Sequence, residues 1–313
     1  MVQTPATSRM PRLTTLQSPS RRILQRFLWY TLPAFLLACA PEASVPDRPV
    51  VCDSPHVTGS LPPELAEASG IATGSDAVPA WAISDGGPPV LFALDSSGAI
   101  LARVHVRAAR KHDWESLASA TCASGTCLYI GDIGDNLRNR QALRVFRVPE
   151  PQLAQDSTAP ADQFEFRFPD GAHDTEALFV LPGERLFVVT KGRSEPISVY
   201  RYPGPLFADS VVTLELVQQL SPSFVQLPDM ITGAGASPDG EWVVLRTYTT
   251  AQLYRLSSGQ LEPALPSPGL DLQVLREFQG EGVDIRADGT ILLLSEKGFG
   301  EGNAPISRVA CTL

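Results

Sequence analysis

A pattern of apolar and polar positions recurs five times along the chain. Its clearest copy runs from Asp174 to Gly192, where an acidic start is followed by an apolar run, a Pro-Gly turn, a second apolar run and a charged residue. The copies open at positions 69, 115, 176, 232 and 281, so they are spaced by 46, 61, 56 and 49 residues. Strand-length apolar runs at a period of roughly 50 residues predict a propeller or a solenoid.

Each copy contains about four short strand candidates joined by turn signals such as Pro182-Gly183 and Asp239-Gly240. The predicted strands are 90–95 and 100–106 in the first copy, 116–120, 128–130, 143–148 and 164–168 in the second, and 176–181, 185–190, 197–202 and 211–217 in the third. Four antiparallel strands per repeat predict an all-β fold, a single β-propeller. We expect five blades, or six if 218–230 or 261–276 forms a weak extra blade.

The fifth copy ends early, after an apolar run at 306–310, and therefore lacks an outer strand. A strand at 57–61 would complete it and close the ring. This closure would bring Cys52 close to Cys311 and favours a disulfide between them, while Cys122 and Cys127 would clamp a hairpin. The alternative is four free buried thiols. No CxxC or Cys/His zinc pattern is present in the sequence.

The N-terminal region has the features of an export signal. Residues 1–38 combine a long basic segment with an apolar run too short to span a bilayer. The segment Leu36-Leu37-Ala38-Cys39 resembles the lipobox of bacterial lipoproteins, which implies cleavage before Cys39 and its lipidation; the alternative is an uncleaved signal anchor. A proline-rich tether at 39–51 and a propeller domain at 52–313 would follow. We therefore expect a lipid-anchored protein of the bacterial cell envelope, and Ala40 after the cysteine favours the outer membrane.

The net charge of the chain restricts the classes of binding partner that we expect. The chain has 34 Asp and Glu against 25 Lys and Arg, a net charge of −9. A nucleic-acid-binding surface needs a basic surplus, so no nucleic-acid partner is expected. An acidic surplus suits cation binding or solubility.

In a propeller, the innermost strand of each blade lines the central channel. The residue that opens each repeat would lie at the start of this strand, so one residue per blade forms an axial ring: Ser69, Glu115, Glu176, Thr232 and Glu281. Three converging carboxylates would repel one another. A hard cation removes this repulsion, and oxygen-only ligands favour calcium or magnesium over zinc. The alternative is a carboxylate network neutralised by Lys, Arg and backbone amides.

A second recurring position ends the second strand of each repeat. It predicts a channel mouth formed by Asp85, Asp132, Lys191, Arg246 (or Thr247) and Glu296. His112 and His173 precede acidic residues in the same regions, so the candidate catalytic residues are His112, His173, Lys191 and Arg246. Such a mouth could hold an anion above a metal-activated water. The alternative is a rim whose charges pair among themselves.

Two resemblances support these expectations. The Ser69, Glu115, Glu176, Thr232, Glu281 ring resembles the axial ring of the calcium-activated apyrase nucleotidases, which are five-bladed; Thr232 replaces a serine of that pattern and keeps the hydroxyl. The segments 113–115, 131–136 and 174–178 resemble uncharacterised secreted bacterial propeller proteins, a likeness that implies fold and export without a reaction.

The sequence favours a non-catalytic binding module over an enzyme. We expect an axial calcium site, attachment to the membrane through a lipid anchor, and a small anionic ligand or an envelope protein at the channel mouth. The competing hypothesis is a calcium-dependent hydrolase of phosphate or carboxylic esters, similar to a nucleotidase or phytase.

Overall fold

A computed structural model describes residues 49–299 and 304–313, within a unit that spans Arg48–Leu313. These residues form almost only β-strands, together with two single-turn helices, η1 (Pro63–Leu65) and η2 (Gln273–Leu275). None of the helices in this part of the chain is long and apolar enough to cross a membrane. The predicted signal peptide and the lipidated Cys39 lie outside the described residues, as does most of the tether.

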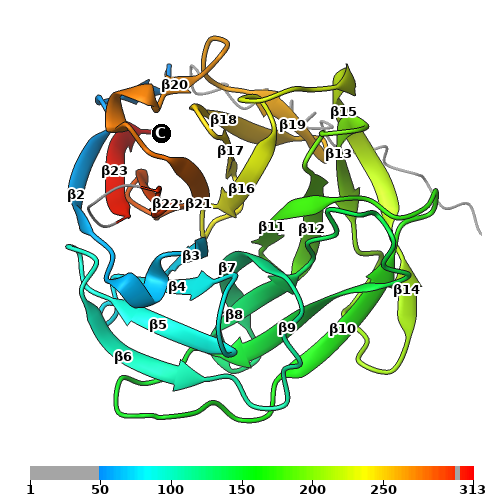
Figure 1. The fold of residues 1–313 in the computed structure, drawn as a ribbon. Coiled ribbons are helices and arrows are strands. Elements are labelled where there is room, and N and C mark those ends of the chain that lie inside the picture. The colour runs from blue at the N-terminus through cyan, green and yellow to red at the C-terminus, as the bar shows by residue number, and fades with distance from the viewer. Residues whose placement is uncertain (1–48, 300–303) are drawn as a thin grey trace, which may run out of the picture. The chain divides into compact units, whose positions relative to one another are not determined.

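The strands form five antiparallel sheets arranged in a ring around a central axis (Figure 1). From the innermost strand outwards, the sheets are β3 (Ala68–Thr73), β4 (Ala80–Ser84), β5 (Val90–Leu94) and β6 (Ile100–His105); β7 (Trp114–Cys122), β8 (Gly125–Asp132), β9 (Leu143–Pro149) and β10 (Asp162–Arg167); β11 (Thr175–Leu181), β12 (Arg185–Thr190), β13 (Pro196–Arg201) and β15 (Glu215–Phe224); β16 (Ile231–Ala236), β17 (Trp242–Thr247), β18 (Thr250–Ser257) and β19 (Gln260–Pro263); and β21 (Gln279–Ile285), β22 (Thr290–Glu296) and β23 (Pro305–Thr312). The predicted five-bladed propeller is thus confirmed.

Four short strands extend these sheets. β1 (Val51–Cys52) and β2 (His56–Ser60) pair with β23, β14 (Val211–Thr213) pairs with β10, and β20 (Leu270–Asp271) pairs with β18. The strand from the N-terminal side therefore completes the fifth blade, as predicted. Cys52 faces Cys311 across the β1–β23 pair and forms a disulfide with it, and a second disulfide joins Cys122 to Cys127.

The hydrophobic core consists of five clusters, and each lies between two neighbouring blades. The cluster between the second and third blades, for example, packs Tyr129 and Phe166 against Leu178 and Val188. An innermost strand has a blade on each side, so every residue of β11 is buried. This double burial explains why the inner strands read as continuous apolar runs, while the outer strand β6 alternates between buried and exposed positions.

The inner strands approach one another closely. A Cβ on Gly70 of β3 would lie 2.7 Å from the backbone nitrogen of Leu117 on β7, and a Cβ on Gly233 of β16 would lie 2.3 Å from the carbonyl oxygen of Glu281 on β21. Both glycines follow a predicted ring residue directly. Neighbouring blades can therefore meet at the axis only because these positions carry no side chain.

The prediction for the outer strand of the third blade was wrong. Residues 211–217 do not form one strand: β14 runs parallel to β10 of the second blade, and β15 then completes the third blade. The connection between the blades thus adds a strand to one sheet before it enters the next. The two segments considered for a sixth blade form no blade of their own. Residues 218–230 contribute to β15 of the third blade, and residues 261–276 contribute to β19 and β20 of the fourth blade and to η2, which follows them.

Candidate functional site

The five predicted axial residues occupy equivalent places in the five inner strands. Each inner strand pairs regularly with the second strand of its blade except at one point, where the register shifts. The shifts lie between Ala68 and Gly70, Trp114 and Ser116, Thr175 and Ala177, Ile231 and Gly233, and Gly280 and Val283. A β-bulge turns a side chain out of the regular alternation. Ser69, Glu115, Glu176, Thr232 and Glu281 are therefore the bulged residues of five matching strands.

The two hydroxyl groups of this ring connect neighbouring blades. Ser69 Oγ donates a hydrogen bond to the carbonyl oxygen of Trp114 at 2.6 Å, and Thr232 Oγ1 donates one to the carbonyl oxygen of Gly280 at 2.7 Å. Each acceptor immediately precedes the ring glutamate of the next blade. Because a hydroxyl that donates its proton keeps its lone pairs, both oxygens remain able to coordinate a cation.

Glu176 has a cation partner within the protein. Its carboxylate accepts a hydrogen bond from Nζ of Lys191, which follows β12, and both side chains are buried. Burial raises the pKa of Glu176, and the Lys191 charge opposes this rise. Lys191 was predicted at the channel mouth, but the structure places its ammonium group inside, against the axial ring.

Glu281 is only partly satisfied. Its Oε1 accepts a hydrogen bond of 2.6 Å from Gln279 Nε2, whereas its Oε2 is buried and has no hydrogen-bond partner among the described residues. Burial raises the pKa of Glu281 well above its ordinary value, and the neighbouring charge of Glu176 adds to the effect. A buried carboxylate oxygen without a donor is costly unless a proton or a cation compensates it.

Glu115 belongs to a cluster of three carboxylates at the junction of the first two blades. Asp85 follows β4, Asp113 precedes β7, and one oxygen from each of Asp85, Asp113 and Glu115 lies within 4.8 Å of the others. Burial, followed by the Glu176 charge, raises the pKa of Glu115 strongly. Burial, followed by the Asp113 charge, raises the pKa of Asp85 to about 6. No ion pair joins these three carboxylates to a basic side chain in the described part of the chain.

Lys111 is a basic residue near these three carboxylates, yet its ammonium group is hydrogen-bonded to backbone carbonyl oxygens. Its Nζ donates to the carbonyl oxygens of Ser84 and Gly86, the latter at 2.7 Å, and lies 5.4 Å from the ring centre of Trp114. Its charge acts on the cluster only through space. The three carboxylates therefore offer oxygen ligands for a cation without first having to break an ion pair.

The structure corrects the register of the predicted mouth. The residue before each bulge pairs with Ser84, Asp132, Thr190, Thr247 or Ser295, so the next position along the second strand is Asp85, Ile133, Lys191, Tyr248 or Glu296. Asp85, Lys191 and Glu296 are thus equivalent, but Asp132 and Arg246 are not. Tyr248, which the sequence did not single out, takes the fourth place. Burial, then the Glu281 charge, raises its pKa to about 12, and the nearby Lys191 opposes this rise.

Asp132 and Arg246 are instead buried structural residues. Asp132 pairs with Arg140 at 3.0 Å and accepts from the backbone nitrogen of Asp113 at 3.0 Å. Arg246 pairs with Glu277 at 2.6 Å and donates to the carbonyl oxygen of Gly282 at 3.1 Å. Their charges are neutralised by these partners, and both residues are fully buried.

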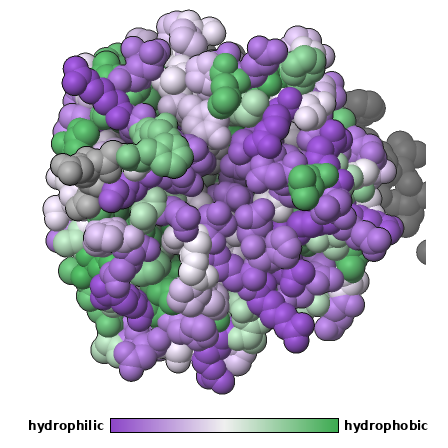
Figure 2. All heavy atoms as spheres, viewed as in Figure 1, coloured by the Kyte–Doolittle hydropathy of each residue, from purple (hydrophilic) through white to green (hydrophobic). Residues whose placement is uncertain are grey.

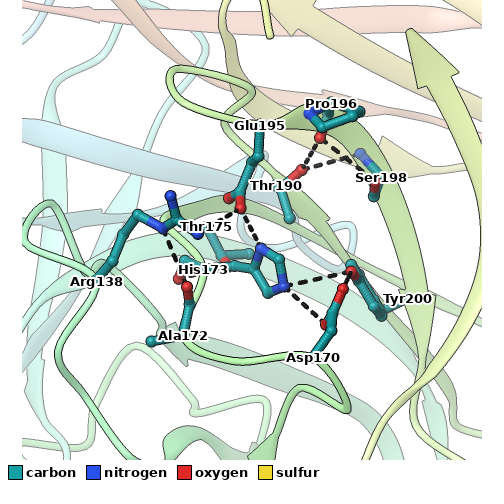
Figure 3. Close-up of polar contacts among 10 residues, drawn as sticks. All are labelled: Arg138, Asp170, Ala172, His173, Thr175, Thr190, Glu195, Pro196, Ser198 and Tyr200. Carbon is teal, nitrogen blue, oxygen red and sulfur yellow. Dashed lines mark hydrogen bonds and ion pairs between the residues drawn. The ribbon is translucent and has the colours of Figure 1, made fainter. Parts of the chain in front are cut away.

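The two candidate histidines lie apart from any hydrolytic arrangement. The side chain of His112 is exposed, and its backbone nitrogen donates to Asp132 Oδ2 at 3.3 Å. His173 is buried between Glu195, bound to its Nδ1, and Asp170, whose Oδ1 lies 2.9 Å from its Nε2 (Figure 3). Burial lowers the pKa of His173, but these two carboxylates outweigh burial and raise it. His173 thus links two loops through both of its ring nitrogens, which are occupied by carboxylates.

Several residues at the acidic end of the channel were missed. Glu67, Asp113, Asp174 and Gln279 each stand two residues before a ring position. The backbone confirms their equivalence, because Asp85, Ile133 and Lys191 donate their N–H groups to the carbonyls of Glu67, Asp113 and Asp174 respectively. The repeat alignment already contained this signal, in the acidic residue two places before Ser69, Glu115 and Glu176. Figure 2 shows mainly hydrophilic residues over the centre of the ring.

Of three comparisons with known proteins, only the comparison with solved structures finds matches. No protein-family model matches the chain, and no curated protein sequence matches it. The solved structures similar to it include the PQQ-bound aldose sugar dehydrogenase of Streptomyces coelicolor (10% identity, 84% of this chain and 98% of that chain, TM-score 0.48), the apo aldose sugar dehydrogenase of Escherichia coli (9%, 83% and 99%, 0.50) and a gluconolactonase of Xanthomonas campestris (13%, 84% and 97%, 0.44). At these identities the likeness concerns the β-propeller fold alone.

Proposed function

We propose that this protein is a lipid-anchored propeller module of the bacterial envelope that binds calcium at the acidic end of its channel. The carboxylates of Asp85, Asp113 and Glu115 carry this proposal, since they come together from two blades and have no bonded cation partner among the described residues. The buried free oxygen of Glu281 adds a further possible donor in the same channel. The hydroxyls of Ser69 and Thr232 complete a set made only of oxygen atoms.

The donor set supports calcium over transition metals. Cysteine thiolates are excluded because Cys52, Cys122, Cys127 and Cys311 are all in disulfides. The buried histidine of the region, His173, uses both ring nitrogens on carboxylates. Carboxylate, hydroxyl and carbonyl oxygens are the ligands of hard cations, and calcium tolerates an irregular ring better than magnesium does.

Export and anchoring are part of the proposal. The two disulfides support export, because disulfides form and persist in an oxidising compartment such as the periplasm or the cell surface. Lipidation of Cys39 would anchor the domain to the outer membrane through the tether that follows it. The acidic channel end, with its bound cation, would then present a site for a small anionic ligand or an envelope protein.

Calcium should raise the melting temperature of the purified protein, because it binds a carboxylate cluster that exists only in the folded state. At about 100 times its Kd, calcium adds about 2.7 kcal/mol of stability, which corresponds to a shift of roughly 5 to 10 °C for a domain of this size. Thermal unfolding with calcium and with a chelator measures this shift. Glu115→Gln should abolish most of it.

The matched control is Glu215→Gln, which removes an exposed carboxylate paired with Arg201 far out on β15 and should leave the calcium shift unchanged.

The rise in melting temperature that calcium causes should also grow with pH. The pKa of folded Asp85 is raised to about 6, so its contribution to the stability of the metal-free protein is lost as the pH rises through 6. Calcium binds the deprotonated form and restores that stability. A melting temperature indifferent to calcium from pH 5 to 8 would refute the site.

A metal-dependent hydrolase is the second candidate, favoured by two carboxyl groups that titrate near neutrality at the mouth. Burial raises the pKa of Glu296 to about 7, and Asp85 titrates at about 6. Such groups can accept a proton from water at physiological pH. This candidate predicts calcium-dependent turnover of p-nitrophenyl phosphate or p-nitrophenyl acetate that Glu296→Gln lowers about 100-fold. The binding-module proposal predicts no turnover above that of the Glu115→Gln variant.

A further inference from the structure

A hollow lies between the loops that connect β8 to β9 and β10 to β11. It has a volume of about 410 Å³. Both loops belong to the end of the propeller at which the ring residues begin their strands, yet the lining residues of this cleft are distinct from the carboxylate cluster. We call it the arginine cleft, after Arg138, Arg140 and Arg167, which line it together with Asp135, Phe168 and His173.

The lining of the arginine cleft is basic, although the protein carries a net charge of −9. Three guanidinium groups and the imidazole of His173 line it together with the carboxylate of Asp135. Three carboxylates outside the lining, those of Asp132, Asp170 and Glu195, pair with Arg140, with His173, and with His173 and Arg138. Asp135 is itself occupied, because it accepts hydrogen bonds from the backbone nitrogens of Asn139 and Arg140 at 3.0 and 2.9 Å. A ligand in the cleft therefore depends on the guanidinium nitrogens that have no partner among the described residues.

Two of the arginines have donors to spare. Arg167 donates its Nε to Thr213 Oγ1 at 3.0 Å, and its two terminal nitrogens have no partner in the described ranges. Arg138 donates its Nε to the carbonyl of Ala172 and pairs its Nη2 with Glu195 at 3.1 Å, which leaves Nη1 free of described partners. Arg140 is different, since its two terminal nitrogens already bond Gly134 and Asp132.

The wall that carries Arg138 is held in place by a clamp of charged groups. Figure 3 shows the Glu195 carboxylate between the imidazole of His173 and the guanidinium of Arg138, with Asp170 on the other side of the imidazole. Tyr200 donates to Asp170 at 3.2 Å. Residues from two loops and from β13 thus fix the position of Arg138, and an anion that it binds meets a preorganised donor.

We propose that the arginine cleft binds a small molecule through a terminal oxyanion, a phosphate or a carboxylate, held by Arg138 and Arg167. The amide side chains of Asn139 and Gln141, which also line the cleft, can bond hydroxyl groups of the same ligand. The proposal is independent of the calcium site, because no cluster carboxylate lines the cleft.

Calorimetric titration of the full chain with inorganic phosphate and, separately, with succinate tests the proposal, in low salt and with a chelator present. At least one of the two anions should bind at 1:1 stoichiometry, and the better one identifies the oxyanion. Arg167→Gln should weaken its binding about tenfold or more, because it removes charge-assisted hydrogen bonds. Arg138→Gln should weaken it similarly.

Arg185→Gln provides the matched control, since Arg185 is an exposed arginine at the β11–β12 turn that also uses its Nε on a carbonyl. Its affinity for the anion should equal that of the unchanged protein. If Arg138→Gln fails to fold, Arg167→Gln decides alone, because Arg167 is outside the clamp. The proposal is overturned if neither anion binds, or if Arg167→Gln binds as tightly as Arg185→Gln.

Discussion

Replacing Lys191 with methionine should destabilise the propeller by about 3 kcal/mol. The substitution keeps the length and apolar stem of the side chain but leaves the buried Glu176 carboxylate without a cation, and breaking a buried ion pair from one side costs about 3 to 5 kcal/mol. Protonation of Glu176 relieves part of this cost, so we expect the lower end of the range. Denaturant-induced unfolding measures the loss.

Two further variants separate the ion pair from general damage. Lys191→Met combined with Glu176→Gln should recover much of the lost stability, because neither charge is then buried alone. Arg201→Met breaks an ion pair with Glu215 in which both side chains are about half exposed, and should cost less than about 1 kcal/mol. A Lys191→Met cost as small as that of Arg201→Met would contradict a buried pair at the axis.

The cost of Lys191→Met should also depend on pH in a defined direction. Burial raises the pKa of Glu176, and without Lys191 only the Arg193 charge opposes this rise. A carboxyl group with a raised folded pKa favours the folded state below its unfolded pKa and loses that contribution as the pH rises through its folded pKa. The difference between the variant and the unchanged protein should therefore be larger at pH 8 than at pH 5.

The ion pair also bears on the number of cations that the channel holds. Lys191 neutralises Glu176 and acts through space on Glu281, so the lysine supplies one positive charge on that side of the ring. The Asp85, Asp113 and Glu115 cluster lies on the other side and has no such partner among the described residues. The same ring can thus satisfy one part with a lysine and offer the other to calcium. If calcium binds as proposed, the two alternatives weighed from the sequence both hold in one channel.

The inner strands could be predicted from the sequence because their environment repeats. Each is buried on both faces and carries a bulge at the same place, so residues 115, 176 and 281 align without any structure. Outer strands lack this constraint, since one face and one edge meet solvent. The segment 211–217 has the composition of a strand, yet two sheet edges are open to it. In the structure β14 pairs with the outer edge of the second blade. Composition contains no information on that choice.

Side-chain partners far along the chain were equally invisible. Arg246 is a charged residue close to the end of a strand and was therefore expected at the rim. In the structure it is buried, and Glu277, 31 residues later, neutralises its charge. Lys191 differs from Glu296 and Asp85 in charge while sharing their position, and only the distance to Glu176 shows that it points inwards. The mouth was therefore predicted at the correct end of the second strands, but Asp132 and Arg246 were placed one and two positions out of register. The charge pairing of its residues could be seen only in the coordinates.

Removal of the Cys52–Cys311 disulfide should destabilise the protein by about 4 kcal/mol, the other large effect that we expect. The bond joins residues 259 positions apart, so it restricts the unfolded chain far more than a local bond does, and loop-closure estimates reach about 5 kcal/mol for such a span. It also fastens β1 and β2 to β23, the contact through which the first and last parts of the ring meet. Guanidinium unfolding of the Cys52→Ala, Cys311→Ala protein measures the loss.

The second disulfide supplies the matched control, since Cys122 and Cys127 are only 5 positions apart. The same loop-closure argument gives about 2 kcal/mol for their removal. The ring-closing bond should therefore stabilise the domain by about twice as much, and its loss should also expose 49–60 to proteolysis while the Cys122→Ala, Cys127→Ala protein keeps this segment protected. Equal losses in the two proteins would mean that strand pairing alone closes the ring, because β2 would then hold to β23 through its hydrogen bonds without the covalent link.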